Sequence, residues 1–191
     1  MKLIELFNLE RKDEPVPSEE PMPPAEALSA AFAILTRHDK TVSREIEACV
    51  ADTEKYYSDR GEVLERRGLC YSEESSPWLC VIAAVEAAAK EGHLREVSAD
   101  CSADVFSGAL KGLLAASGMV FSIDKIKFDD QKNLNFWVRQ FNEYAGQSGI
   151  TLYFVDLYTD ACAMGVARIA DYAEAAEIAG YAGVKITCRP A

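Results

Sequence analysis

The sequence has only two histidines, His38 and His93, among its 191 residues, and this scarcity limits the chemistry it can support. His38 closes an expected first helix, where a histidine favours the helix dipole and usually does nothing else. His93 follows Gly92 and precedes Asp100 and Cys101, which together would allow a cysteine nucleophile with a histidine base. A polar helix exit is the simpler interpretation of this segment, so we predict no catalytic residue in it.

Motifs that indicate catalysis or phosphate binding are also missing. There is no Gly-x-Ser-x-Gly turn, no glycine-rich phosphate loop, no His-Glu-x-x-His pair and no calcium-loop pattern. The six cysteines form no Cys-x-x-Cys pair and show no zinc-ligand spacing, so we interpret them as small core residues. They are Cys49, Cys70, Cys80, Cys101, Cys162 and Cys188. These absences favour a non-enzyme with no metal or other cofactor, although they leave the question of an activity open.

Positive charge is in short supply, with 20 basic against 31 acidic side chains and a net charge of −11. Phosphate contacts need clustered Lys and Arg, so nucleic acid is excluded as the main partner. The longest apolar run, Trp78–Ala89, is interrupted by Glu86 and is shorter than the roughly 20 residues of a membrane span. The N-terminus does not resemble a signal peptide, which predicts a cytoplasmic protein with reduced thiols.

Proline is concentrated at one place and divides the chain. Five of the seven prolines lie in residues 13–24, a Pro/Glu-rich stretch that we interpret as an extended linker. It would connect an N-terminal segment, residues 1–12, to a single α+β domain, residues 25–191. Whether the N-terminal segment docks on that domain is left open.

Apolar residues at helical spacing dominate the first two-thirds of the domain. The expected helices begin at Pro24, after Thr41 or Ser43 with a break at Gly61, at Ser75-Ser76-Pro77, at Ser102 and at Leu134. The third of these, Trp78–Lys90, is apolar nearly all round, so we predict that other elements surround it. Gly108 and Gly112, one turn apart in the next helix, predict close packing against a neighbour.

The last quarter of the chain predicts strand, turn, strand, helix and strand. The strands are expected at Ile150–Asp156, Ala161–Ile169 and Val184–Cys188, with the helix over Asp171–Gly180. Alternation over Met119–Phe128 predicts one further strand or two short ones. We therefore predict an α+β fold, with the helical N-terminal two-thirds packed on one face of a small, mostly antiparallel sheet of three to five strands. In the alternative, the helix between Arg168 and Gly183 makes a right-handed crossover that creates one parallel pair.

Carboxylates near strand ends are the remaining candidates for a site. The turn after the first C-terminal strand supplies a predicted binding surface, made of Asp156, Tyr158 and Asp160. Carboxylates converging at strand ends can hold Mg²⁺, and Asp124, Asp129 and Asp130 would be their partners. Because Asp also forms turns through its own backbone, a turn is the competing interpretation.

The hydrophobic pattern of Trp78–Gly92, Ser102–Leu114 and Leu152–Val166 resembles that of small uncharacterised bacterial α+β proteins of unknown function. The resemblance implies a buried helix, a helix after an acidic loop, and a hairpin–helix–strand end. It rests on pattern without a motif, so it implies no catalytic residue.

Three functions are compatible with these features. The first is a non-enzymatic cytoplasmic domain, similar to immunity or adaptor proteins, whose acidic surface binds a protein partner with a basic surface. The second is a metal-assisted hydrolase that uses the strand-end carboxylates. The third is a structural homodimer subunit, in which residues 3–9 contribute an apolar contact.

Overall fold

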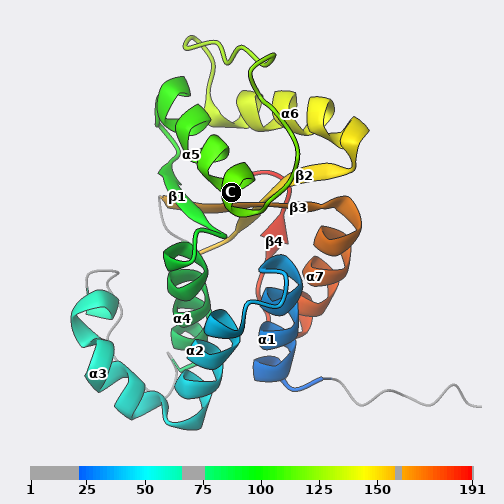
Figure 1. Ribbon diagram of the computed structural model, residues 1–191. Helices are drawn as coiled ribbons and strands as arrows, with labels where there is room; N and C mark the ends of the chain where they lie inside the picture. The colour runs from blue at the N-terminus through cyan, green and yellow to red at the C-terminus, as the bar shows by residue number, and fades with distance from the viewer. Residues whose placement is uncertain (1–21, 66–75, 158–160, 191) are drawn as a thin grey trace, which may run out of the picture.

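A four-stranded antiparallel sheet lies at the centre of the molecule, between two layers of helices (Figure 1). The computed structural model describes residues 22–65, 76–157 and 161–190, so the predicted segment 1–12 and most of the linker 13–24 fall outside the described residues. The strands are β1 (Arg95–Ser98), β2 (Ile150–Val155), β3 (Ala161–Arg168) and β4 (Ile186–Thr187), in the spatial order β1-β3-β2-β4. The predicted α+β class is confirmed.

Strand β2 is buried along its whole length because helices cover both faces of the sheet. Successive side chains of a strand point to opposite faces. Tyr153 and Val155 accordingly join one hydrophobic core, and Leu152 and Phe154 join the other. The prediction that the helices pack on one face only was wrong. The sequence contains no sign of two covered faces. A strand that is buried on both faces is a continuous apolar run, without the alternation of apolar and polar residues that would indicate which face is covered.

The first core lies under helices α1 (Pro24–Leu35), α2 (Lys40–Ala51), α4 (Ser76–Lys90) and α7 (Ile169–Tyr181). Helix α4 is buried on nearly every side, from Leu79 to Ala88, as its composition predicts. Helix α1 packs along α7, and α2 packs along α4 (Figure 1). The first core therefore joins N-terminal helices to the C-terminal helix.

Helix α3 (Thr53–Glu65) projects from this layer, away from the sheet (Figure 1). The break between α2 and α3 falls at Asp52, which ends α2 with ψ 85° and whose Oδ1 accepts a hydrogen bond from the N–H of Lys55 at 3.0 Å. The predicted break at Gly61 was wrong, since α3 continues through that residue. A capping aspartate determined the break, and the glycine is tolerated inside the exposed helix.

The second core lies between the other face of the sheet and helices α5 (Ala103–Ala116) and α6 (Leu134–Ala145). The predicted helix start at Ser102 is confirmed, since Ser102 Oγ accepts from the N–H of Val105. Asn133, which was not predicted as a cap, begins α6 in the same way, and its Oδ1 accepts from the N–H of Phe136. Gly108 is exposed and Gly112 has open space except for Arg95 Nε at 3.9 Å, so the predicted close packing at the two glycines was wrong.

The segment between α5 and α6 is irregular, so the strand predicted over Met119–Phe128 was wrong. Its aromatic side chains cover the second core instead: Phe121 contacts Phe141 edge-on at 5.8 Å, and Phe128 contacts Phe106 edge-on at 5.0 Å. The alternating apolar side chains of this segment pack on α5 and α6, and they do not belong to a strand.

The C-terminal order of strand, strand, helix and strand is confirmed, with a short 3-10 helix, η2 (Gly146–Ser148), before β2. Strand β4 pairs with β2 in the antiparallel sense, so the alternative with a hydrogen-bonded parallel pair was wrong. Strands β3 and β4 run in the same direction on either side of β2, and α7 connects them. Strand β1 was missed because Val97 is its only buried apolar residue.

Candidate functional site

The predicted binding surface falls mainly outside the described residues. Asp156 follows β2 and is half-buried, and its N–H donates a hydrogen bond to the carbonyl of Lys185 at 3.0 Å. This bond ties the start of the turn to the chain that enters β4. Tyr158 and Asp160 lie outside the residues that the structure describes, so the binding surface stays a prediction.

The acids proposed as metal ligands have local roles. Asp124 accepts a hydrogen bond from Ser122 Oγ at 2.8 Å and lies 3.7 Å from Lys111 Nζ. Asp129 Oδ1 accepts from the N–H of Gln131 at 2.9 Å, as a turn aspartate does. Across residues 22–65, 76–157 and 161–190, no three His, Cys, Asp or Glu side chains are grouped as metal ligands. The metal-assisted hydrolase, whose proposed ligands include Asp160 outside the described residues, stays a prediction.

His93 pairs with a residue that the sequence did not indicate. Its Nε2 lies 3.0 Å from Oδ2 of Asp39, the N-cap residue of α2, and this hydrogen bond is the main reason why the pKa of Asp39 is lowered. The pKa of Cys101 is raised, first by burial and then by Asp100. A raised pKa is the opposite of what an activated cysteine nucleophile needs, so the structure does not favour that alternative.

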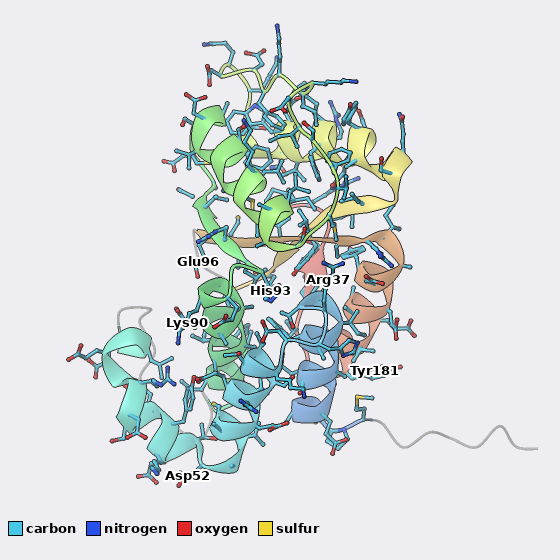
Figure 2. All side chains as sticks on the ribbon, viewed as in Figure 1. Arg37, Asp52, Lys90, His93, Glu96 and Tyr181 are labelled. Atoms are coloured by element: carbon cyan, nitrogen blue, oxygen red, sulfur yellow. The ribbon has the colours of Figure 1, made fainter. Side chains whose placement is uncertain are left out.

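The turn that carries Asp39 joins the two helical layers. Arg37 and His38 both have left-handed backbone conformations, with φ of 57° and 62°, which side-chain-bearing residues rarely adopt. The guanidinium of Arg37 donates to the carbonyl of Ser117 at the end of α5. Figure 2 shows Arg37 and His93 near the sheet, at the ends of α1 and α4. The Arg37 contact thus connects this turn to α5 in the other helical layer.

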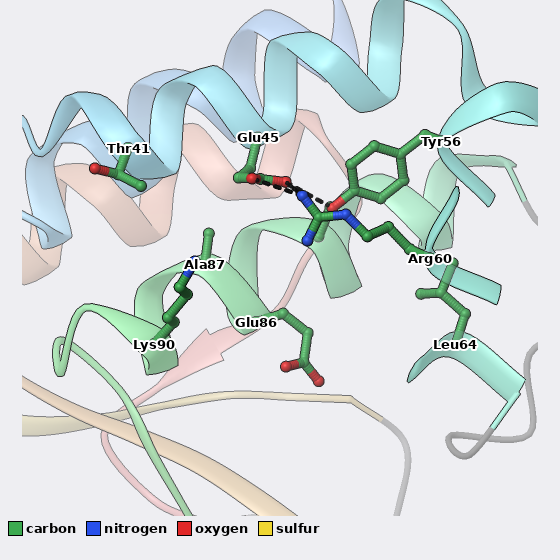
Figure 3. A pocket seen from close by; sticks show the side chains of 9 residues that line it. Thr41, Glu45, Tyr56, Arg60, Leu64, Glu86, Ala87 and Lys90 are labelled. Atoms are coloured by element: carbon green, nitrogen blue, oxygen red, sulfur yellow. Dashed lines mark hydrogen bonds and ion pairs between the residues drawn. The ribbon is translucent and has the colours of Figure 1, made fainter. Parts of the chain in front are cut away.

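A pocket with several charged side chains lies between α2, α3 and α4, and has a volume of about 230 Å³ (Figure 3). Glu45 on α2 accepts a hydrogen bond from the Tyr56 hydroxyl at 3.0 Å and from Nη2 of Arg60 at 2.9 and 3.0 Å, one to each carboxylate oxygen. The guanidinium of Arg60 lies over the Tyr56 ring, 5.5 Å from its centroid. Two residues of α3 are therefore organised around one carboxylate of α2.

Helix α4 completes the pocket from the side opposite Glu45 (Figure 3). It contributes Glu86 and Lys90, while Leu64, Ala83 and Ala87 supply apolar lining. The pKa of Tyr56 is raised, first by burial and then by the negative charge of Glu45, so the phenol stays protonated as a donor. The pocket thus combines two carboxylates and two basic side chains, Arg60 and Lys90, with an apolar floor, which suits an extended side chain with a charged end.

The outer surface of α3 is acidic. Of its thirteen residues four are acidic and two are basic, and one of the basic residues, Arg60, is paired with Glu45. Glu54, Asp59 and Glu65 are exposed. We call the outer surface of α3 together with the pocket the acidic arm. No sequence motif marks this pocket. The spacing of four between Tyr56 and Arg60 was the available signal.

The fold and the acidic arm define an α+β protein with a charged pocket between α2, α3 and α4. Residues 27–191 match the model of a family described as a domain of unknown function (DUF6630), so the chain belongs to this family. Comparison with curated proteins and with solved structures gives no match. The sequence-based resemblance to an uncharacterised family is confirmed, while the bacterial origin stays a prediction. No helix within the described residues is long and apolar enough to cross a membrane.

Proposed function

We propose that the chain is a non-enzymatic, cytoplasmic binding protein whose acidic arm takes a basic segment of a protein partner. The observation that carries this proposal is the acidic excess on the exposed surface of α3, a helix that projects away from the sheet (Figure 1). Projecting surfaces with one dominant charge speed the encounter with partners of the opposite charge.

The pocket adds a reason for specificity. Glu45 already holds one guanidinium against an aromatic ring, and Glu86 lies across the pocket with an apolar floor between them. An arginine or lysine of the partner would place its aliphatic stem on Leu64 and Ala87 and its charge near Glu86. The exposed acids of α3 would then contact neighbouring basic residues of the same segment.

Charge reversal with a matched control tests the proposal. The wild-type chain, an arm variant (Asp59→Lys with Glu65→Lys) and a control variant (Glu174→Lys with Glu177→Lys) are immobilised. The control changes the net charge equally, on exposed residues of α7. Proteins retained from the extract of the source cells are identified by mass spectrometry, and each is then purified and its affinity measured by calorimetry.

We expect a partner that binds the wild-type chain and the control alike, binds the arm variant at least about tenfold more weakly, and loses affinity as salt is raised. If the arm variant and the control lose affinity equally, net charge alone explains the loss, and the proposal is overturned. Retention of chaperones alone, or unchanged affinity of the arm variant, would overturn it as well.

A further inference from the structure

Two cysteines far apart in the sequence meet inside the first core. The Sγ atoms of Cys49 on α2 and Cys80 on α4 lie 3.6 Å apart, and both residues are free thiols. Cys49 is fully enclosed, whereas Cys80 retains 9% of its surface exposed. A disulfide needs a sulfur–sulfur distance of about 2 Å between side chains on adjacent backbones. Cys49 and Cys80 lie on helices that pack along one another, which holds the two sulfurs side by side.

A route to Cys80 exists beside this pair. Cys80 lines a mainly apolar cavity of about 310 Å³, which also contacts α1, α2 and the end of α7. Leu28, Val50, Val81 and Ala182 are among its lining residues. Because the lining offers no cationic group, it favours small neutral molecules over anionic ones. Cys49 does not line the cavity, so an incoming molecule meets Cys80 first.

The pKa values of the two thiols are shifted in opposite directions. The hydrogen bond between them lowers the pKa of Cys80 and raises the pKa of Cys49, whose burial acts in the same direction. When Cys80 ionises, the Cys49 thiol donates to the thiolate. The accessible sulfur is thus the nucleophile, and the enclosed sulfur keeps its proton until a mixed disulfide has formed.

We propose that Cys49 and Cys80 form a reversible dithiol–disulfide site that exchanges with small neutral disulfides entering through the apolar cavity. The Cys80 thiolate attacks one sulfur of the incoming disulfide, the sulfur–sulfur bond breaks, and the first thiolate leaves. Cys49 then loses its proton and attacks the Cys80 sulfur, which releases the second thiolate. Two protein thiols are oxidised, one small disulfide is reduced to two thiols, and the two protons of the protein thiols pass to the products.

Peptide mapping of the wild-type chain is the first test, with 2-hydroxyethyl disulfide as the neutral probe. The folded protein is equilibrated in mixtures of the probe and its thiol, remaining thiols are alkylated, and linked peptides are identified by mass spectrometry. We expect the Cys49–Cys80 linkage to be the predominant internal disulfide and to disappear when the thiol is in excess. A Cys49–Cys80 linkage no more abundant than linkages to Cys101, Cys162 or Cys188 would overturn the proposal.

Trapping variants test the order of attack. Cys49→Ala removes the second thiol, so the mixed disulfide on Cys80 should accumulate at least about tenfold over the wild-type level. Cys80→Ala should leave Cys49 unmodified, and the exposed Cys188→Ala should exchange as the wild-type chain does. Circular dichroism confirms that each variant is folded. Modification of Cys49 in the Cys80→Ala variant, or no adduct in folded Cys49→Ala, would contradict the assigned roles.

Discussion

The side chain of Asn142 on α6 completes the backbone hydrogen bonding of Leu152 in β2. Asn142 Oδ1 accepts from the N–H of Leu152 at 2.7 Å, and its Nδ2 donates to the Leu152 carbonyl at 3.4 Å and to the Cys188 carbonyl at 3.3 Å. Strand β4 is short and pairs only with Phe154 and Val155, so it leaves this part of the β2 edge unpaired. One amide thus replaces a strand neighbour.

Removing the Asn142 amide is expected to lower the stability of the protein. Asn142→Ala leaves the buried N–H of Leu152 without its acceptor, and we expect the free energy of unfolding to fall by about 1–3 kcal/mol. Asn142→Asp keeps an acceptor but lacks the donors for two carbonyls, so it should be destabilised at least as much. Urea denaturation measures both. Asn135→Ala, at an exposed position of the same helix, is the control, and an equal loss there would argue against the bridging role.

Asn142 also illustrates which features the sequence could predict. Helix α6 could be predicted from its apolar spacing, and α4 from its start signal and apolar composition, because these features depend on residues only a few positions apart. The role of Asn142 depends on which residue of β2 lies opposite α6, and no local pattern contains that information. The same limit applies to the false strand at Met119–Phe128, whose apolar alternation serves aromatic packing on α5 and α6.

The candidate site was hidden for a related reason. Glu45 and Arg60 are separated by fifteen positions, and they meet only because Asp52 ends one helix and begins the next. Cys49 and Cys80 are separated by thirty-one positions and meet through the packing of α2 on α4. The sequence shows which motifs are missing. Which distant residues pair through helix packing can be seen only in the structure.

Gly165 of β3 and Tyr153 of β2 are directly opposite each other in the sheet, and the tyrosine ring occupies the space that a β-carbon at position 165 would need. Tyr153 is fully buried, so the ring has no room to move aside. We expect Gly165→Ala to lower the free energy of unfolding by about 1–3 kcal/mol. The loss should be smaller in a Tyr153→Leu background, as a double-mutant cycle would show.

Gly108→Ala, where the added carbon meets open space in α5, should be stabilising by about 0.5–1 kcal/mol.

The hydrogen bond between Asp39 and His93 predicts a dependence of stability on acid pH. The pKa of Asp39 lies below its ordinary value of 3.8, so its contribution is complete above that value and is lost as the pH falls through the lower folded pKa. Asp39→Asn keeps an N-cap acceptor for Thr41 but removes the carboxylate. We expect this variant to be less stable than the wild-type chain by about 1 kcal/mol near pH 6, and the difference to shrink below about pH 4. A difference that is equal at both pH values, measured by urea denaturation, would contradict this origin.

The pKa of the Tyr56 phenol depends on the charges of the pocket. Its pKa is raised above the ordinary value of 10, first by burial and then by Glu45, while Arg60 acts in the opposite direction. Its contribution to stability is therefore complete below about pH 10 and is lost as the pH rises toward the folded value. Glu45→Gln removes the negative charge and should shift the phenolate transition to lower pH, whereas Arg60→Gln should shift it to higher pH. Difference absorbance titrations against the same variants carrying Tyr56→Phe isolate this residue, with circular dichroism confirming that the chain is folded. Shifts of the same sign in the two variants would mean that Glu45 and Arg60 do not act on Tyr56 as opposite charges.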